Sequence, residues 1–434
     1  MSKKVLVIGL QRSGHAAIKL LLKEGFEVVV TINNELTKED QEILKDIQVY
    51  AGSHPDHLLD ENWEFIVKNP GVPYRIPFVQ KALAKGFSII SEIELGYRYS
   101  KNINLAITGT NGKTTTTTLV YEILKKAKDN VYCAGNIGLP LCDVVFKHDN
   151  DNTIVLELSS FQLMGITSFK PHIATILNLA PDHLDYMPTL ASYYESKQAI
   201  YEYQDENDYF LLNEDDKTIK EYLKDIKAKV ISYSLHQKAD AYLRDNWLYF
   251  NDEAIIDTNK IQIIGQHNLY NILVALCYAK LMKVSNEIIQ EVVYNFKGVE
   301  FRLEEVKGFK NNVYFNDSKS TTPESTIIAI NALKDKPTVL ILGGFRKGLD
   351  FSDLIASVNE NPNIEQVLTF GQIKDEFGEI NCLTKPFANL EEIIDYLEVT
   401  VDDKNILFSP ATSSFDQYDN YEQRGRHFNK LIKR

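Results

Sequence analysis

The sequence LAITGTNGKT at residues 105–114 establishes the character of the central part of this chain. An apolar run typical of a buried parallel strand leads into a glycine-containing loop, and Gly112-Lys113-Thr114 then opens an amphipathic helix. Such a loop curls backbone N–H groups around a phosphate, and the helix N-terminus adds positive potential. The segment therefore predicts a nucleotide-binding α/β domain.

The residue types in this loop favour ATP together with Mg²⁺. Lys113 would contact the β- and γ-phosphates, and the hydroxyl of Thr114 would bind the metal ion. One departure is that Ile107 stands six residues before the lysine, where the general P-loop pattern has a glycine. A chance Gly-Lys-Thr would not explain why strand, loop and helix are all in place. The expected ATP-binding residues of this loop are Gly109, Thr110, Asn111, Gly112, Lys113, Thr114 and Thr115.

Polar residues also follow two other strands expected in the same domain. Glu157 ends the apolar run 153–156, and His183 comes after the run 173–177. Ligands of a doubly wound sheet gather at the carboxyl ends of its strands, so we expect both side chains near the phosphates. A carboxylate is an ordinary Mg²⁺ ligand, whereas a histidine is less usual and, taken alone, is more often a loop hydrogen-bonding residue. Taken alone, Lys197 would be a solvated lysine.

A second glycine-containing segment, residues 9–14, follows an apolar run near the N-terminus. It matches the dinucleotide-binding fingerprint except that Gln11 replaces the middle glycine, which lets the backbone touch a pyrophosphate. No acidic residue for a ribose follows the second strand until Glu35. NAD and FAD are therefore disfavoured. Two interpretations stay open: a plain helix-packing turn, or a loop that holds a different nucleotide through side chains.

The length and the order of the patterns predict an α/β protein with three tandem domains. At roughly 150 residues a domain, 434 residues correspond to about three domains, and 44% apolar residues can fill their cores. We expect a Rossmann-like domain at 1–97, a central P-loop ATPase-like domain at 98–298 and a second Rossmann-like domain at 299–434.

The acidic composition argues against large polyanionic partners. Lys and Arg number 47 against 60 Asp and Glu, a formal net charge of −13, so repulsion would oppose binding to nucleic acid or an anionic membrane. No apolar run approaches the ~20 residues that span a bilayer, and the N-terminus lacks the apolar core of a secretory signal. The four cysteines form no Cys-x-x-Cys pair. We expect a cytoplasmic protein with no nucleic-acid or membrane partner.

Motifs spread over the whole chain resemble those of the Mur ligase family of peptidoglycan synthesis. They are Thr108–Thr114, Asn136–Gly138, Glu157–Leu163, Asp182–Asp185, Gly265–Asn268, Asn316–Lys319 and Ser409–Ala411. Within the family, ELSSFQL at 157–163 and SFDQY at 414–418 are most similar to the members that add D-glutamate. The 108 residues before Gly109 leave room for a separate UDP-binding domain, which the related folate polyglutamate ligases lack.

The resemblance implies ATP-dependent ligation of D-glutamate to UDP-N-acetylmuramoyl-L-alanine by a monomer, through an acyl phosphate and a tetrahedral intermediate. Positioning and neutralisation of charge dominate such chemistry. The implied catalytic residues are Lys113, Glu157, His183 and Lys197. Two Mg²⁺ ions are implied, held by Thr114, Glu157, His183 and Lys197. Lys197 could bind a metal directly only as a carbamate, which turns its ammonium group into an anionic oxygen ligand.

The remaining roles also follow from the resemblance. Adenine and ribose would be held by Asn268, Asn271, Arg302 and Asp317. The UDP substrate would contact Leu10, Gln11, Thr31, Gly71 and Asn136. D-glutamate would contact Lys319, Thr321, Lys347, Ser414 and Tyr421. The sequence departs from the family pattern at two places. Phe301 stands where a histidine is expected, so that one nucleotide contact is lost or replaced by stacking. Thr31-Ile-Asn33 lacks the acid that the family often has at the uracil pocket.

Three alternatives stay open. A sibling ligase would add a different amino acid, above all L-alanine. A P-loop phosphotransferase with an unrelated N-terminal domain would release a phosphorylated product without a new amide. A non-catalytic nucleotide-binding scaffold gives no reason for Glu157, His183 and two lysine-bearing loops to accompany the phosphate loop.

Overall fold

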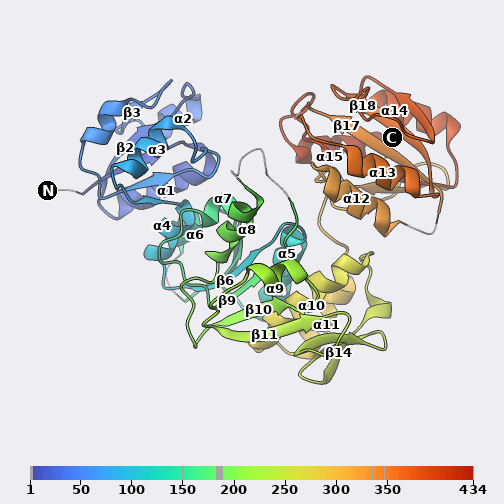
Figure 1. Cartoon of the computed structure of the whole chain (residues 1–434), viewed down its shortest axis with the longest axis horizontal. Helices are drawn as coiled ribbons and strands as arrows, with labels where there is room; N and C mark the ends of the chain where they lie inside the picture. Colours follow the sequence, from blue (N-terminus) through green and yellow to red (C-terminus); the bar gives the residue numbers. More distant parts are fainter. Residues whose placement is uncertain (1–2, 149–150, 182–188, 334–335, 347, 434) are drawn as a thin grey trace. The chain divides into compact units, whose positions relative to one another are not determined.

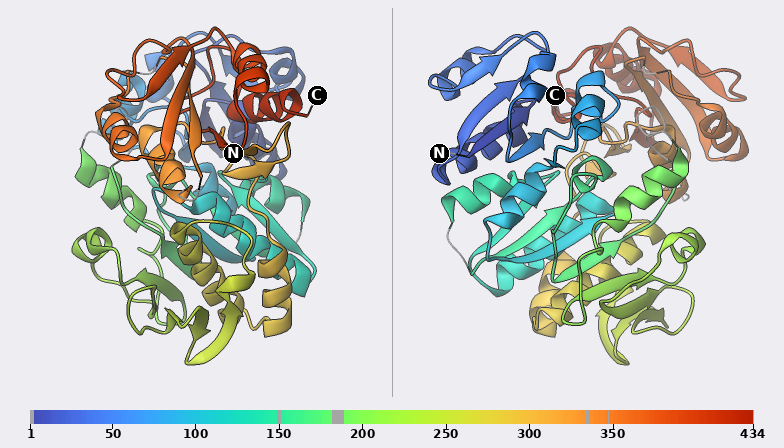
Figure 2. Two further views of the ribbon diagram at one scale, coloured as in Figure 1. Left: turned by 90° about the vertical axis from the view of Figure 1, so that its right-hand side faces the viewer. Right: turned by 60° about the vertical axis from the view of Figure 1, so that its left-hand side comes forward.

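The computed structural model describes residues 3–148, 151–181, 189–333, 336–346 and 348–433, and these contain three β-sheets. Each sheet is formed by one continuous stretch of chain, so each has its own range of colours in Figures 1 and 2. The α/β class and the three-domain organisation are confirmed. By its internal contacts the chain divides into two compact units, Met1–Lys260 with Leu269–Tyr294, and Ile261–Asn268 with Asn295–Arg434. The domain boundaries given above stay predictions.

The first sheet is fully parallel, in the order β3-β2-β1-β4-β5. Its strands are β1 (Lys4–Ile8), β2 (Glu27–Thr31), β3 (Gln48–Tyr50), β4 (Phe65–Lys68) and β5 (Ile89–Ile90). Its helices are α1 (Gln11–Lys23), α2 (Lys38–Ile43), η1 (Asp56–Asp60), α3 (Pro77–Ala84) and α4 (Glu92–Arg98). Val5 and Val7 face the core with α1, whereas Leu6 and Ile8 face the core with α3. The strand order reverses between β1 and β4, which is where such sheets bind ligands.

The second sheet has the order β14-β13-β12-β11-β10-β9-β6-β8-β7. Its strands are β6 (Ile103–Thr108), β7 (Val131–Gly135), β8 (Thr153–Glu157), β9 (Ile173–Ile176), β10 (Tyr209–Asn213), β11 (Lys229–Ser234), β12 (Ala241–Arg244), β13 (Trp247–Phe250) and β14 (Glu253–Asp257). Its pairs are parallel up to β12, and the β12–β13–β14 edge is antiparallel. These three edge strands are consecutive in the sequence and form a small antiparallel meander at the end of the sheet.

Eight helical segments of the described chain lie in the sequence between β6 and the third sheet. They are α5 (Lys113–Ala127), α6 (Leu141–Lys147), α7 (Ser160–Leu163), α8 (Leu190–Gln198), α9 (Lys217–Tyr222), η2 (Thr258–Lys260), α10 (Gln266–Leu281) and α11 (Asn286–Asn295). One continuous core joins α1 and α4 to α6 and the second sheet, which explains why the first two sheets form a single compact unit. Among the described residues, no helix is both long and apolar enough to cross a membrane.

The third sheet has the order β15-β16-β20-β17-β18-β19, antiparallel only at β15–β16. Its strands are β15 (Glu304–Val306), β16 (Val313–Asn316), β17 (Thr338–Gly344), β18 (Ile364–Gly371), β19 (Leu383–Pro386) and β20 (Asn405–Phe408). Its helices are α12 (Pro323–Ala332), α13 (Ser352–Glu360), α14 (Leu390–Thr400) and α15 (Tyr421–Leu431). Val339 and Ile341 pack in one core with α14 and α15, whereas Leu340 and Leu342 pack in another with α12 and α13. Buried parallel strands with helices on both faces require such unbroken apolar runs.

Candidate functional site

The phosphate loop lies between β6 and α5, as predicted, and two of its residues must be glycine. Gly109 has φ +149° and Gly112 has φ +81°, a region that side chains disfavour. A Cβ at position 112 would also lie 2.5 Å from Oδ1 of Asn271, which belongs to α10. Asn271 Oδ1 in turn accepts a hydrogen bond of 3.1 Å from the Thr116 hydroxyl. Asn271, predicted to contact the nucleotide, thus packs directly against the phosphate loop.

The loop is held in shape by Asn178, which follows β9. The Asn111 N–H donates to Asn178 Oδ1 over 2.8 Å, and Asn178 Nδ2 donates back to the Asn111 carbonyl over 3.0 Å. The Thr110 N–H donates to the Asn178 carbonyl over 3.0 Å. Protein contacts alone therefore fix this loop. Because the first N–H groups of a helix lack intrahelical acceptors, those at the start of α5 are the donors suited to a phosphate.

Lys113 and Thr114 stand at the start of α5, where the sequence placed them. Lys113 Nζ donates to the carbonyls of Gly109 over 2.8 Å and Thr110 over 2.7 Å, so its ammonium group lies against the loop. Thr114 is buried beside it. A positive charge and a hydroxyl meet at the point where the terminal phosphates of a nucleotide and a metal ion would lie.

Glu157 carries the strongest sign of a missing partner. It ends β8, next to β6, and its side chain is buried. Its Oε1 accepts a hydrogen bond of 2.7 Å from Asn136 Nδ2, whereas Oε2 is buried without a hydrogen-bond donor among the described residues. A buried carboxylate oxygen without a donor is costly unless a ligand or cation compensates it. The residue therefore fits a Mg²⁺ ligand, since that ion prefers carboxylate oxygens.

Lys197 is not the solvated lysine that its sequence context alone suggested. It lies on α8 with only 1% of its surface exposed, because α8 packs against the phosphate loop. Its Nζ donates to the Gly109 carbonyl over 3.1 Å and to Ser160 Oγ over 3.0 Å, and lies 4.5 Å from the centre of the Tyr193 ring. The structure thus brings Lys197 to the loop that contains Lys113.

Other predicted residues of this region are placed less completely. Asn136 supports Glu157 through its side chain and also donates its N–H to the Glu157 carbonyl over 2.8 Å. His183 and Lys347 lie outside the described residues. Within the described part of the chain, no three His, Cys, Asp or Glu side chains cluster as a metal site would require. Any metal site at the phosphate loop therefore needs phosphate oxygens, or residues beyond that part, besides Glu157.

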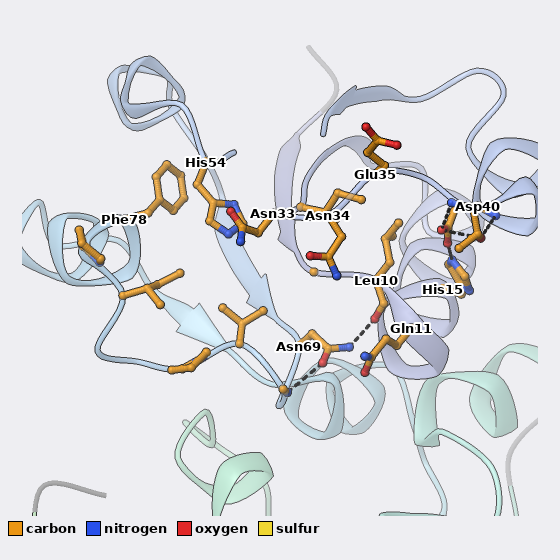
Figure 3. Close-up of a pocket in the computed structure, with 18 of the residues that line it drawn as sticks. Leu10, Gln11, His15, Asn33, Asn34, Glu35, Asp40, His54, Asn69 and Phe78 are labelled. Atoms are coloured by element: carbon orange, nitrogen blue, oxygen red, sulfur yellow. Dashed lines mark hydrogen bonds and ion pairs between the residues drawn. The ribbon is translucent and has the colours of Figure 1, made fainter. Parts of the chain in front are cut away.

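A pocket of about 830 Å³ lies at the carboxyl ends of β1, β2 and β4 (Figure 3). This volume suits a small-molecule ligand. Three predicted substrate residues line it, namely Leu10, Gln11 and Gly71, but Thr31 does not. Thr31 is fully buried, and its hydroxyl contacts Nδ1 of His54 over 2.9 Å. His54 and Phe78, which do line the pocket, were missed because no local pattern links them to β1.

Side chains tie together the two loops that form the floor of this pocket. Asn69 Nδ2 donates to the Leu10 carbonyl, and the Gly71 N–H donates to Asn69 Oδ1 over 2.9 Å. Beneath them Lys68 Nζ donates to the Val72 carbonyl over 2.9 Å, and burial lowers the pKa of Lys68 to about 8. A Cβ at Gly14 would lie 2.6 Å from the Gly9 carbonyl oxygen, so segment 9–14 is a helix-packing turn. The same segment also lines the pocket, through Gly9, Leu10 and Gln11.

The second compact unit contains most of the residues predicted for adenine, ribose and D-glutamate. Asp317 is buried, and its Oδ1 and Oδ2 accept from the Leu303 N–H over 3.1 Å and from Ser409 Oγ over 2.7 Å. Burial raises the pKa of Asp317 to about 6, which the charge of Arg302 opposes. Nε of Arg302 is buried without a hydrogen-bond acceptor in the described part of the chain. A buried donor of this kind calls for an acceptor, so the Arg302 guanidinium fits a ligand contact.

Phe301, which replaces an expected histidine, is buried within the same unit. A Cβ at Gly425 would lie 2.4 Å from its ring, so the ring packs closely on the backbone of α15. The Phe301 N–H donates to Glu304 Oε2 over 3.0 Å. Its aromatic surface is thus used within the protein. Asn268 caps the preceding turn by donating to the Ile264 carbonyl over 2.6 Å.

Among the described residues predicted for D-glutamate, Lys319 and Thr321 follow β16, whereas Ser414 and Tyr421 follow β20, and a buried arginine joins these two segments. Lys319 Nζ lies 5.5 Å from the centre of the Tyr421 ring, and Ser414 is buried. Arg424, fully buried, donates to Ser318 Oγ over 3.0 Å and to the Thr412 carbonyl over 3.1 Å. Arg424 was not recognised as important from the sequence, since only the tertiary contacts show that it connects these loops.

Comparisons of the sequence with known proteins find Mur ligases along nearly the whole chain. Residues 107–279 match the Mur ligase middle domain, and residues 3–91 match the MurD-like N-terminal domain of Mur ligases. A UDP-N-acetylmuramoylalanine--D-glutamate ligase of Bacillus cereus (strain G9842) is 40% identical over 446 residues, covering 99% of this chain and 97% of that protein. A protein of the same name from Streptococcus pyogenes serotype M1 is 39% identical over 440 residues, covering 98% of this chain and 96% of its own.

Solved structures share the fold at low sequence identity. MurF ligase from Thermotoga maritima, in complex with ADP, has a TM-score of 0.64 at 16% identity and covers 99% of this chain and 95% of its own. UDP-N-acetylmuramate-alanine ligase MurC from Thermotoga maritima has a TM-score of 0.60 at 18% identity, covering 98% of each chain. With nearly full-length relatives and two matching domain models, the chain belongs to the Mur ligase family.

Proposed function

We propose that this chain is an ATP-dependent ligase that joins D-glutamate to UDP-N-acetylmuramoyl-L-alanine in peptidoglycan synthesis, releasing ADP and phosphate. The observation that carries the proposal is 40% identity, over 99% of the chain, to a ligase named for this reaction. Relatives of the same name at 39% identity favour D-glutamate over the amino acids that sibling ligases add. The phosphate loop, with Glu157 and Lys197 beside it, supports ATP as the source of free energy.

The chemistry requires ATP because a free carboxylate is a poor electrophile. An oxygen of the L-alanyl carboxylate attacks the γ-phosphorus, the bond between that phosphorus and the β,γ-bridging oxygen breaks, and ADP leaves. The amine of D-glutamate then attacks the carbonyl carbon of the acyl phosphate and loses a proton. The tetrahedral intermediate expels phosphate and leaves the amide. Because the protein forms no covalent bond, its work is to position the reactants and neutralise charge.

Each residue near the phosphate loop has a role in this scheme. Lys113 and the first N–H groups of α5 neutralise the terminal phosphates. Thr114 and Glu157 would hold one Mg²⁺, which when bound screens phosphate charge and orients the nucleotide. His183 and a carbamylated Lys197 would hold a second. The burial of Lys197 against Gly109 supports this role, because it brings the side chain next to the phosphate loop.

The UDP substrate, the nucleoside part of ATP and D-glutamate are assigned to further residues. The pocket on the first sheet takes the UDP part, through Leu10, Gln11 and Gly71, while Thr31 acts indirectly through His54. Adenine and ribose are assigned to Asn268, Asn271, Arg302 and Asp317. D-glutamate is assigned to Lys319, Thr321, Lys347, Ser414 and Tyr421, where two lysines can neutralise its two carboxylates. The enzyme is proposed to act as a cytoplasmic monomer.

An amino-acid panel with detection of ADP, phosphate and product mass tests the proposal. Phosphate release that depends on both UDP-N-acetylmuramoyl-L-alanine and D-glutamate, with a new amide in the product, is expected. Release that depends only on L-alanine would assign a sibling reaction, and a phosphorylated product without an amide would assign a phosphotransferase. Labelled oxygen in the acceptor carboxylate should appear in the released phosphate, because the acyl phosphate transfers that oxygen.

A further inference from the structure

The pocket on the first sheet has regions of different chemistry (Figure 3). Leu10, Gln11 and Asn69 lie in its middle, next to the N-terminus of α1, where backbone N–H groups favour an anion. At one end lie Glu35 and Asp40, whose negative charges would repel a phosphate. At the opposite end lie the rings of His54 and Phe78. Asp56 also lines the pocket, but its carboxylate is paired with the ammonium group of Lys81. A uridine diphosphate with its phosphates near α1 would therefore place its neutral base toward the rings.

His54 is held in a defined orientation. Its ring centre lies 5.4 Å from that of Phe78, with 32° between the planes. The Thr31 hydroxyl lies 2.9 Å from His54 Nδ1 and 3.2 Å from the Ser53 carbonyl oxygen, which can only accept. A hydroxyl has one proton, so both contacts are satisfied only if Thr31 donates to Ser53 and Nδ1–H donates to Thr31.

This hydrogen-bond arrangement determines what the other ring nitrogen can do. Burial lowers the pKa of His54, so its imidazole is neutral near pH 7, and with the proton on Nδ1 its Nε2 is a bare acceptor. The other histidine of the pocket, His15, cannot play this part because its Nε2 lies 2.7 Å from Asp40 Oδ1. For His54, no bond to Nε2 exists among the described residues.

We propose that His54 is a specificity-determining residue that selects uracil over cytosine by accepting a hydrogen bond from the N3–H of the base. N3 of uracil carries a proton, whereas N3 of cytosine is a bare acceptor and would face the lone pair of Nε2. The same Nε2 therefore attracts one base and repels the other. The proposal rests on the proposed function, which assigns a UDP substrate to this pocket, and adds the residue that distinguishes the base.

The test measures binding of UDP and CDP to the full-length protein by isothermal titration calorimetry. His54→Phe keeps a ring against Phe78 but removes the acceptor. UDP affinity is expected to fall about tenfold while CDP affinity does not fall, so the UDP/CDP ratio collapses. His57→Phe is the matched control, because His57 is exposed, does not line the pocket and should leave both affinities unchanged. An unchanged UDP/CDP ratio in His54→Phe, or an equal loss for both nucleotides, would overturn the proposal.

Two further measurements separate recognition from folding and from the proposed function. Thr31→Val keeps the buried shape but removes the hydroxyl that orients His54, so the ratio should fall by about threefold; no change would contradict the tautomer argument. In ligation assays His54→Phe should raise KM for the UDP substrate without lowering kcat. If the wild-type protein ligates D-glutamate but the ratio in His54→Phe is unchanged, only this inference fails. If the wild-type protein neither binds UDP nor ligates D-glutamate, the proposed function fails.

Discussion

Two loops of this protein join a central strand of a parallel sheet to the next helix, yet they are built differently. Between β6 and α5, Gly109 and Gly112 adopt left-handed backbone angles, and the loop presents N–H groups at a helix N-terminus. Between β1 and α1, Gly9 is also left-handed, with φ +83°, but the second left-handed position is occupied by Gln11, with φ +57°, and Asn69 Nδ2 donates to the Leu10 carbonyl. The second sheet thus offers a ligand a backbone shaped by two glycines, whereas the first adds pocket-lining side chains to the N–H groups at the start of α1.

This difference between the two loops explains why the phosphate site could be predicted from a local sequence pattern, whereas the nucleotide pocket on the first sheet could not. A phosphate is held by backbone N–H groups and one lysine, so its site requires a fixed local pattern of glycines and Gly-Lys-Thr. A pyrimidine nucleotide offers a base whose edge must be read by side chains, which can come from any strand end. Substitutions in the two loops should accordingly have separate effects.

The largest expected effect is that of Lys113→Ala. Removing the ammonium that neutralises the terminal phosphates should lower kcat/KM about 10²–10³-fold, which is the loss typical of a deleted charge-stabilising group. UDP binding to the pocket on the first sheet should be unchanged, because Lys113 begins α5 and its Nζ donates to the Gly109 and Thr110 carbonyls of the phosphate loop, and Lys113 does not line that pocket. Steady-state phosphate release and UDP titration check both halves; a parallel loss of UDP affinity would contradict the separation of the two sites.

Glu157→Gln should lower turnover about 100-fold and raise the Mg²⁺ concentration needed for half-maximal rate, because an amide is a weaker ligand than a carboxylate. Without nucleotide, the melting temperature should stay equal or rise, since the variant removes a buried charge whose Oε2 has no donor in the described structure. Activity over a magnesium titration and a thermal melt provide the readouts. A lower melting temperature with normal magnesium dependence would show that Glu157 is structural.

Gly112→Ala should destabilise the first compact unit by about 1–3 kcal/mol, because the new Cβ meets both a left-handed φ and the Asn271 side chain. ATP binding should weaken with it. Gly25→Ala is the matched control for the backbone effect alone, since Gly25 has φ +80° but open space around its Cβ. Equal losses of stability in both variants, measured by denaturation, would mean that the close approach of Asn271 does not matter.

The smallest expected effect is that of Gln11→Gly, which relieves a left-handed non-glycine residue and should stabilise the protein by up to about 1 kcal/mol. UDP affinity should nevertheless fall a few-fold, because the variant removes a pocket-lining side chain. Thermal melts and UDP titration give the two values. If UDP affinity rose instead, the first loop would resemble the phosphate loop in binding through backbone, and the comparison between them would break down.

Local chemistry made the phosphate loop, its helix and the Glu157 strand end predictable from the sequence. Gly109, Gly112, Lys113 and Thr114 act through backbone angles and one helix start, which neighbouring residues dictate. The sheet class was predictable for a similar reason, since unbroken apolar runs suit only strands buried on both faces. Lys197 could not be judged in this way: its surroundings in the sequence suggest solvent, but α8 places it against Gly109.

The order of residues alone therefore specified the α/β class, the phosphate loop and the acidic strand end. Each of these depends on contacts within a few residues. Folding in three dimensions was needed to reveal the burial of Lys197, the role of Asn178 as a brace, the link that Arg424 makes between two loops, and the His54–Phe78 end of the nucleotide pocket. These depend on which strand ends become neighbours, and strand order is set by packing of the whole sheet rather than by any local pattern.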